Sequence, residues 1–241
     1  MVEAERQTPS WDLEGDAKRS AVRSIFAQIA NDYDRANAIM SFAQHQVWRR
    51  KAARLLNLKP GDSVLDLCSG TGDFLAPLRK LVGPKGKLYA LDLTPEMLSK
   101  ASSKDSEAQL LVGDACVLPF HDQTFEGVSV GWGIRNVPDI DQAHREAFRV
   151  LKSGGMFVSI DCAQPRLAVI RPVSAFFRKS LLGQLDRSLG HDGAYSYLDE
   201  STKLFRSREG LKESMSDAGF VDVRFFDLCL GNICIHVGRR P

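Results

Sequence analysis

The chain has 241 residues, 44% of them hydrophobic and 26% charged, which is typical of a water-soluble protein with one substantial core. Its formal net charge of +2 gives no case for a nucleic-acid partner, and no segment approaches the apolar length that spans a membrane. The five cysteines form no CxxC pair and suit no disulfide framework, so we expect reduced thiols, no metal site and a cytoplasmic location.

The N-terminal region predicts a flexible leader followed by a helical lid. Residues 1–20 are polar and carry both signs of charge, without the apolar stretch of a signal peptide. Between residues 21 and 57 apolar side chains recur at helical spacing, which predicts two or three short helices. We expect residues 21–241 to form a single domain that begins with this lid.

After a turn at 59–62, apolar runs typical of buried strands alternate with segments of helical spacing. The expected strands are 63–67, 88–91, 109–112, 127–130 and 156–160. The expected helices between them are 71–82, 95–102 and 140–151, the last ended by a turn at Gly154 and Gly155. This alternation predicts a parallel sheet that binds its ligand at the carboxyl ends of the strands.

The C-terminal part departs from this alternation. Residues 165–202 form a connection of nearly forty residues, too long for a simple crossover, so we assign 165–205 as a helical insertion on the substrate side. A helix at 208–218 and two antiparallel strands at 221–228 and 232–237 should follow. The predicted fold class is α/β, with a Rossmann-like, seven-stranded, mostly parallel sheet and an antiparallel C-terminal hairpin.

A glycine loop follows the first predicted strand. In Gly70-Thr71-Gly72 the two glycines let the backbone approach a ligand, and the helix behind them offers free N–H groups. The third glycine of an NAD fingerprint is replaced by Leu75, and the Gly-Lys-Ser/Thr of a phosphate-binding P-loop is missing.

Acidic residues accompany three successive strands. Asp66 lies under the glycine loop and can orient it. Asp92 can accept from both hydroxyls of a ribose, and Asp114-Ala115 can meet an adenine edge. Any one of these aspartates alone could simply cap a helix. Together with the glycine loop they favour a nucleoside without phosphates, for which S-adenosylmethionine is the usual ligand.

With these motifs the sequence resembles the ubiquinone/menaquinone biosynthesis C-methyltransferase family, over nearly the whole chain from about Ile25. The most specific signal is Gly133-Ile134-Arg135-Asn136-Val137, where the family has Gly-Leu-Arg-Asn-Val; Phe26 to Asn37 is similar to its opening motif. The resemblance implies a class I S-adenosylmethionine methyltransferase fold. The candidate cofactor-binding residues are Tyr33, Asp66, Gly70, Thr71, Gly72, Asp92, Leu93, Asp114, Ala115 and Gly131.

Some positions depart from the family pattern. Gly131 stands where the family often has Ser, so a hydroxyl contact is missing, and Asp114 replaces a frequent Asn. Asp161-Cys162 meets an expected Glu/Asp-Phe pair only in part, and Phe205-Arg206 replaces Phe-Pro. These differences fall on the substrate side.

Arg135 and Asn136 are the candidate catalytic residues. Ring C-methylation requires a quinol to lose a hydroxyl proton, at least partly; Arg135 can stabilise the phenolate and Asn136 can orient it. Arginine is a poor base, so we expect the proton to leave through a water or a histidine. Alternatively, both residues only fix their loop. Tyr33 either closes over the cofactor or belongs to the lid core, and His191 and Tyr195 are expected to line the substrate channel.

The resemblance implies C-methylation of a polyprenylated, lipid-soluble quinol such as demethylmenaquinol. Methylation of another small aromatic or natural-product acceptor, and non-catalytic binding of S-adenosylmethionine, remain alternatives. Because such a quinol lives in the bilayer, the segment 166–187, with five basic residues against Asp186, is expected to touch the inner membrane face or to be a lid helix with a solvated basic face. A monomer and a homodimer both remain open.

Overall fold

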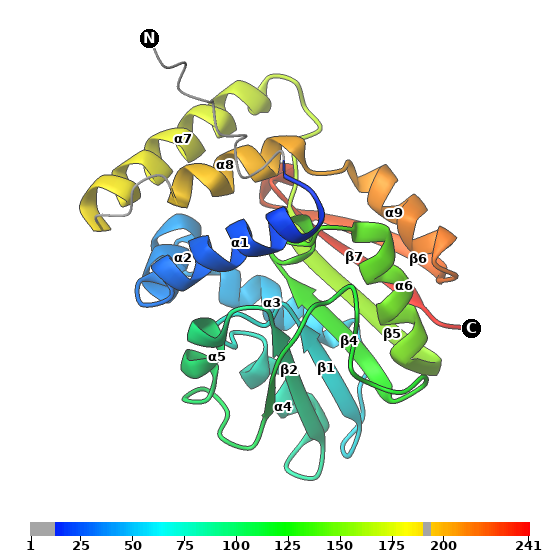
Figure 1. The fold of residues 1–241 in the computed structure, drawn as a ribbon. Helices are drawn as coiled ribbons and strands as arrows, with labels where there is room; N and C mark the ends of the chain where they lie inside the picture. Colours follow the sequence, from blue (N-terminus) through cyan, green and yellow to red (C-terminus); the bar gives the residue numbers. More distant parts are fainter. Residues whose placement is uncertain (1–12, 190–193) are drawn as a thin grey trace.

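The structure, a computed structural model, describes residues 13–189 and 194–241. At its centre lies a seven-stranded sheet in the order β3-β2-β1-β4-β5-β7-β6 (Figure 1). Among the described strands only β7 runs against the others, since it pairs antiparallel with both β5 and β6. The strands are β1 (Ser63–Leu67), β2 (Lys87–Asp92), β3 (Gln109–Val112), β4 (Phe125–Gly131), β5 (Leu151–Cys162), β6 (Val221–Leu228) and β7 (Ile233–Arg239).

This topology confirms the predicted fold class, including the antiparallel C-terminal hairpin. Strands β2 and β3 lie on one side of β1, whereas β4 lies on the other side. Such a reversal of strand order opens a crevice at the carboxyl ends of the strands. The sheet therefore sets the ligand site beyond the ends of β1 and β4.

Helices cover both faces of the sheet, each over its own hydrophobic core. One face carries α3 (Gln44–Arg54), α4 (Leu75–Val82) and α5 (Pro95–Ala101). The other carries α6 (Ile140–Val150) and α9 (Arg208–Asp217). Because both faces are covered, the central strands are apolar runs rather than alternating sequences, and β1 is buried from Val64 to Leu67.

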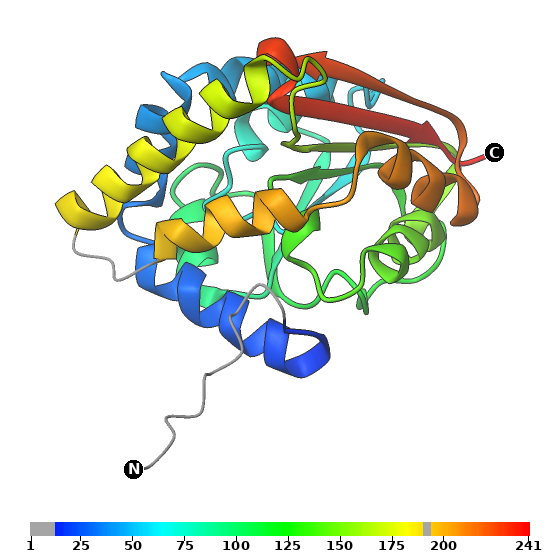
Figure 2. The same ribbon diagram turned by 90° about the horizontal axis from the view of Figure 1, so that it is seen from above.

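Four helices gather beyond the carboxyl ends of the strands and share a third core (Figures 1 and 2). They are α1 (Gly15–Ile29), α2 (Tyr33–Ser41), α7 (Ile170–Leu189) and α8 (Ala194–Leu204). Phe26 and Ile29 of α1 meet Leu182 and Leu185 of α7 in this cluster. The N-terminal helices and the long insertion thus pack together over the site. Within residues 13–189 and 194–241, no helix combines the length and the apolar character needed to cross a bilayer.

Three boundaries differ from the predictions. Helix α1 begins at Gly15, inside the segment predicted as a flexible leader, of which residues 1–12 lie outside the described part. The helix predicted from residue 71 begins at Leu75, because residues 71–74 complete the turn of the glycine loop. The predicted turn after α6 is a bulge inside β5, where the register with β4 shifts and Gly154 has φ +79°.

Candidate active site

A pocket lies at the carboxyl ends of β1 to β4, and α1 contributes Arg19 and Phe26 to its lining. It brings together eight of the residues singled out from the sequence, namely Tyr33, Gly70, Asp92, Leu93, Asp114, Ala115, Gly131 and Asn136. The other four are buried without lining it: Asp66, Thr71, Gly72 and Arg135. Elements far apart in the sequence therefore converge on one site, as the predicted sheet required.

The two glycines of the loop have different tasks. Gly72 has φ +82°, and a Cβ there would lie 2.8 Å from the Ala101 side chain, so this glycine lets α5 pack against the loop. Gly70 has φ +57°, and a Cβ there would meet only Met97 Cε, at 3.5 Å. Gly70 thus leaves its backbone open towards the pocket, while Gly72 closes the packing behind it.

Asp92 is fixed by backbone donors. Its Oδ2 accepts from the Gly70 N–H and its Oδ1 from the Thr94 N–H, each at 2.8 Å. Burial raises the pKa of this carboxyl above its usual value, and the two N–H donors act in the opposite direction. Each carboxylate oxygen can accept more than one hydrogen bond, so a fixed Asp92 can also take the two hydroxyls of a ribose.

Asp66 lies beneath the loop, as its sequence position indicated. It accepts a hydrogen bond from Ser129 Oγ at 2.7 Å, which ties β1 to β4 below the crevice. Burial raises the pKa of Asp66 to about 7. This contact supports a structural role in holding the two strands whose ends form the site.

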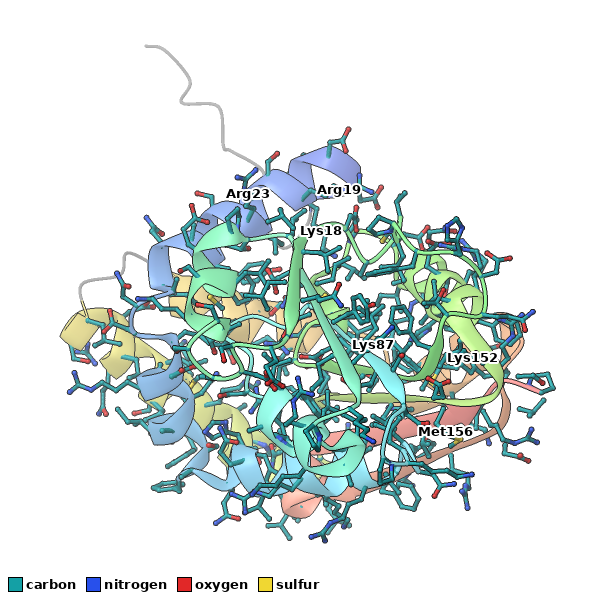
Figure 3. The ribbon with its side chains drawn as sticks, turned by 90° about the horizontal axis from the view of Figure 1, so that it is seen from below. Lys18, Arg19, Arg23, Lys87, Lys152 and Met156 are labelled. Atoms are coloured by element: carbon teal, nitrogen blue, oxygen red, sulfur yellow. The ribbon has the colours of Figure 1, made fainter. Side chains whose placement is uncertain are left out.

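Asp114 meets a partner that the sequence did not indicate. Arg19 Nε donates to Asp114 Oδ2 at 2.5 Å, and the Cys116 N–H donates to Oδ1 at 2.8 Å. Figure 3 shows Arg19 beside Lys18 and Arg23 on α1. Because Arg19 falls inside the predicted leader, its contribution followed from no pattern in the sequence.

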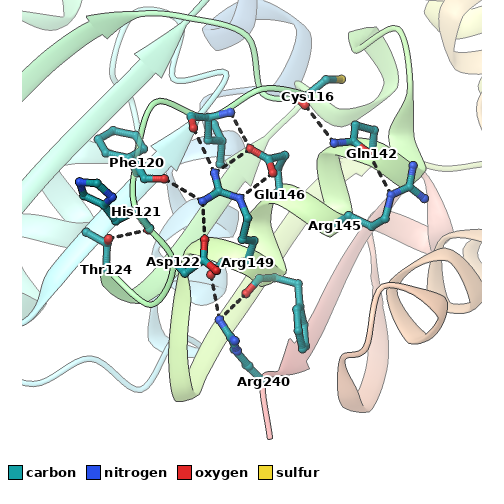
Figure 4. A network of polar contacts seen from close by, with 12 residues as sticks. Cys116, Phe120, His121, Asp122, Thr124, Gln142, Arg145, Glu146, Arg149 and Arg240 are labelled. Atoms are coloured by element: carbon teal, nitrogen blue, oxygen red, sulfur yellow. Dashed lines mark hydrogen bonds and ion pairs between the residues drawn. The ribbon is translucent and has the colours of Figure 1, made fainter.

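The loop that carries Asp114 is held from below by α6 (Figure 4). Arg149 donates to the carbonyl oxygens of Phe120 at 2.8 Å and Leu118 at 3.1 Å. Glu146 pairs with the same guanidinium and accepts from the Leu118 N–H at 2.7 Å. These bonds satisfy the backbone of an irregular segment and thereby help to fix the loop that carries Asp114.

A cluster of charged side chains surrounds Thr71 behind the glycine loop. The Thr71 hydroxyl donates to Asp34 of α2, and Lys104 bridges Asp34 at 2.7 Å and Asp73 at 2.5 Å. Burial alone would raise the pKa of Asp73, but His45, Arg49 and Lys104 together hold it well below its usual range. Thr71 therefore connects the loop to the lid helices.

Packing leaves no room for a serine side chain at Gly131. A Cβ at this position would lie 2.6 Å from Cε2 of Phe74, so the Phe74 ring occupies the space that a serine side chain would need. Gly131 still lines the pocket. The departure from the family pattern thus exchanges a hydroxyl for aromatic packing.

Arg135 and Asn136 form most of the short 3₁₀ helix η1 (Ile134–Asn136) after β4. Arg135 is buried, pairs with Asp161 and donates to the Trp132 carbonyl at 3.2 Å. Burial would lower the pKa of Arg135, but the charge of Asp161 raises it above its usual value. Asp161 Oδ2 is buried without a hydrogen-bond partner among the described residues. Arg135 is thus a permanently charged group just behind the pocket.

Asn136, in contrast, reaches the pocket. Its Nδ2 donates to the Trp132 carbonyl at 3.2 Å and its Oδ1 accepts from the Tyr197 hydroxyl at 3.1 Å. Burial raises the pKa of Tyr197 to about 12, so this hydroxyl stays protonated. Tyr197 of α8 is a site residue that sequence reasoning missed.

Tyr33 belongs both to the core of the lid and to the lining of the pocket. It packs edge-on against Phe26, with ring centroids 6.0 Å apart, in the core of the lid, and it also lines the pocket. Burial raises its pKa above the usual value. His191 and the side chain of Tyr195, both predicted to line the substrate channel, lie outside the described residues.

The donor set fits adenosine better than a nucleotide. Asp92 and Asp114 place two carboxylates in the lining, where they would repel a chain of phosphates. Gly70 leaves open backbone beside them, and Ala115 and Val22 add apolar surface. The residues present are therefore compatible with the S-adenosylmethionine inferred from the sequence.

Comparison with known proteins agrees with this geometry. A sequence profile of the ubiE/COQ5 methyltransferase family matches residues 14–240. A demethylmenaquinone methyltransferase of Staphylococcus aureus is 37% identical over 230 residues, which cover 93% of this chain and 95% of that protein.

Solved structures show the same fold at lower identity. A SAM-dependent methyltransferase of Thermotoga maritima superimposes with a TM-score of 0.66 at 20% identity, covering 91% of this chain and all of that chain. One from Aquifex aeolicus gives a TM-score of 0.58 at 23% identity, covering 79% and 88%. These likenesses show that the chain shares its Rossmann-like fold with those proteins.

Proposed function

Because the chain belongs to the ubiE/COQ5 methyltransferase family, we propose that it methylates a ring carbon of a polyprenylated quinol such as demethylmenaquinol. The chain is an S-adenosylmethionine-dependent methyltransferase; the acceptor is the proposed part. The observation that carries this proposal is that the family-specific loop and the nucleoside carboxylates line one pocket. Gly133, Asn136 and Val137 lie in the same lining as Asp92.

We assign the nucleoside part of the cofactor to the end of the pocket formed by Gly70, Asp92 and Asp114. Asp92 holds the ribose hydroxyls, Asp114 and the Ala115 backbone meet the adenine, and Gly70 lets the chain come close. When bound, S-adenosylmethionine supplies a methyl group already activated by the sulfonium. The protein therefore needs mainly to align the acceptor and exclude water.

Asn136 and Arg135 divide the work on the acceptor side. Asn136 lines the pocket and is held by Tyr197 and the Trp132 carbonyl, so its amide is fixed in one orientation to position a quinol hydroxyl. Arg135 sits behind it with a charge that Asp161 keeps in place. That charge favours the phenolate form of the quinol, which pushes electrons into the ring.

The proton of the quinol needs an acceptor other than these residues. Arg135 and the tyrosines Tyr33 and Tyr197 have pKa values above their usual range, so none of the three is a base at neutral pH. The described lining of the pocket contains no histidine. Of the two routes considered from the sequence, transfer to a bound water is the one we propose.

Methyl transfer to a short-chain demethylmenaquinol tests the proposal. We expect turnover with the reduced quinol and none with the oxidised quinone, which has no hydroxyl proton to lose. Turnover of another phenol with none of the quinol would instead select the alternative acceptor class. Binding of S-adenosylmethionine without turnover of either would show that the acceptor belongs to neither class. Quinones isolated from cells lacking the protein should contain the unmethylated precursor.

A further inference from the structure

Helix α7 carries apolar side chains on two opposite sides. Leu182 and Leu185 face inwards, buried in the core shared with α1 and α8. On the other side Val173 and Phe176 lie one helical turn apart and are 68% and 77% exposed. Val169, one turn before Val173, is 77% exposed. A helix on a protein surface normally turns a polar side outwards, but within residues 13–189 and 194–241 nothing covers the apolar outer side of this half of α7.

The apolar surface continues from α7 onto α2. Phe177, half-exposed, stacks on Phe42 with ring centroids 6.4 Å apart and an angle of 26° between the rings. Phe42 directly follows α2, is 73% exposed and has φ +49°, a conformation that residues with a side chain rarely adopt. Ile39, one turn earlier, is also exposed. We call this surface the α2–α7 face; it comprises Ile39, Phe42, Val169, Val173, Phe176 and Phe177.

The two helices that pack against α2 on either side, α3 and α7, are strongly basic. Helices α3 and α7 together contain eight Lys and Arg residues against the single acid Asp186, whereas the whole chain has 32 basic and 30 acidic residues. The rest of the chain is therefore net negative. Helix α7 packs against α2, and α2 against α3, as Figure 2 also shows. The exposed cations on these helices are Arg50, Lys51, Arg54, Arg171, Lys179 and Arg187.

We propose that the α2–α7 face docks on a bilayer that contains anionic phospholipid. Phe42 and Phe176 enter the boundary between headgroups and acyl chains, while cations such as Lys179 meet the lipid phosphates. A second copy of the chain fits this surface less well, because a symmetric contact would set the same basic helices against each other. The inference goes beyond the proposed function, since it holds whichever acceptor the pocket takes.

Sedimentation of the full chain with phosphatidylcholine vesicles, with and without phosphatidylglycerol, tests this docking. We expect the wild type to bind the anionic vesicles. Phe176→Glu should have an about tenfold lower partition coefficient, because the ring that would enter the lipid is replaced by a charge that the lipids repel. Lys179→Glu should weaken binding about fivefold. Both positions are exposed, so folding should be unchanged, which circular dichroism checks.

Lys87→Glu is the matched control. Lys87 is exposed at the amino end of β2, away from the lid, as Figure 3 shows from below. Its reversal changes the net charge by more than Phe176→Glu does, so a general electrostatic effect would be larger in the control. We expect binding within about twofold of the wild type, because only charges near the lipid contribute strongly.

Three results would overturn the docking. The first is a wild type that does not bind anionic vesicles; the second is equal binding by wild type and Phe176→Glu. The third is a wild-type dimer that Phe176→Glu converts to a monomer without any vesicle binding, which would assign the face to a second copy. The wild type and Phe176→Glu should turn over a water-soluble, short-chain quinol at the same rate. If that turnover is absent while vesicle binding persists, the proposed acceptor fails and the docking stands.

Discussion

Arg19 donates a hydrogen bond to Asp114 over 2.5 Å, and so joins the first helix to the loop after β3 across 95 positions of the chain. The same guanidinium pairs with Asp16 one turn earlier on α1. Arg19 also lines the pocket, so the contact holds α1 over the side of the pocket that Asp114 forms. Helix α1 thereby covers this side of the pocket and is held there by a partly exposed ion pair.

Arg19→Ala should loosen this cover without unfolding the protein. A partly exposed pair contributes at most about 1 kcal/mol, so amide exchange in α1 should rise by up to about fivefold. S-adenosylmethionine should also dissociate faster, since the pocket opens more often. Stopped-flow release and hydrogen exchange measure the two effects. Arg23→Ala, on the same helix but outside the pocket lining, is the control and should change neither.

The glycines of the loop should differ in their sensitivity to alanine. Gly72→Ala combines a positive φ with a Cβ 2.8 Å from Ala101, so we expect a loss of about 3 kcal/mol in the free energy of unfolding. Gly70→Ala meets only Met97 Cε at 3.5 Å and should lose about 1 kcal/mol, while weakening cofactor binding. Urea unfolding and calorimetry separate the two. Equal destabilisation by both variants would show that packing against α5 does not distinguish them.

The pair Arg135–Asp161 should behave as a unit. Removing one member leaves the other charge buried without its partner, so Arg135→Met and Asp161→Asn should each cost about 3 kcal/mol of stability. The double variant should cost clearly less than the sum, which unfolding in urea measures as a coupling energy. If the stability losses of the two single variants add up in the double variant, the two charges do not stabilise each other.

The same variants separate a charge effect from a structural one. Arg135→Lys keeps the charge and should retain more turnover than Arg135→Met at equal stability. Because the charge favours the phenolate, kcat of Arg135→Met should reach its maximum only at a higher pH than in the wild type. A purely structural loss would instead lower kcat by the same factor at every pH.

Two buried histidines should make the protein less stable as the pH falls. Burial lowers the pKa of His144 and of His236 to about 4, so below about 6.5 the unfolded chain binds protons that the folded chain does not. The stabilisation is complete above about pH 6.5 and is lost as the pH falls towards 4. Asp66, whose pKa burial raises, acts in the opposite direction over this range. The contribution of one histidine is therefore measured as the difference in the pH dependence of the free energy of unfolding between a variant and the wild type.

His144→Gln should remove about 2 kcal/mol of the stability change between neutral pH and about pH 5. Urea unfolding at both pH values gives this difference. His121→Gln alters an exposed histidine and serves as the control, with the slope of the wild type expected. An unchanged slope in His144→Gln would show that this ring is protonated in the folded protein.

The sequence predicted the sheet and the grouping of Gly70, Asp92 and Asp114 in one pocket because both depend on short-range patterns. Val64 to Leu67 is a buried run that leads into the glycine loop, and Asp92 is the last residue of β2. The parallel pairing of β1 with β2 therefore brings Asp92 beside that loop. Arg19 and Tyr197 were missed because each reaches the site through tertiary packing that no local spacing encodes. Arg135 carried the most specific motif, yet its ion pair with Asp161 depends on how β5 lies beside β4.

Calorimetric titration of S-adenosylmethionine into Asp92→Ala, Asp92→Asn and wild type tests the site most directly. With two hydroxyl hydrogen bonds to a charged acceptor lost, Asp92→Ala should raise Kd about 100-fold, and Asp92→Asn should fall between the two. Asp217→Ala, an exposed acid on α9, should bind as the wild type does. Wild-type affinity in a folded Asp92→Ala protein would contradict the assignment of this pocket to the cofactor.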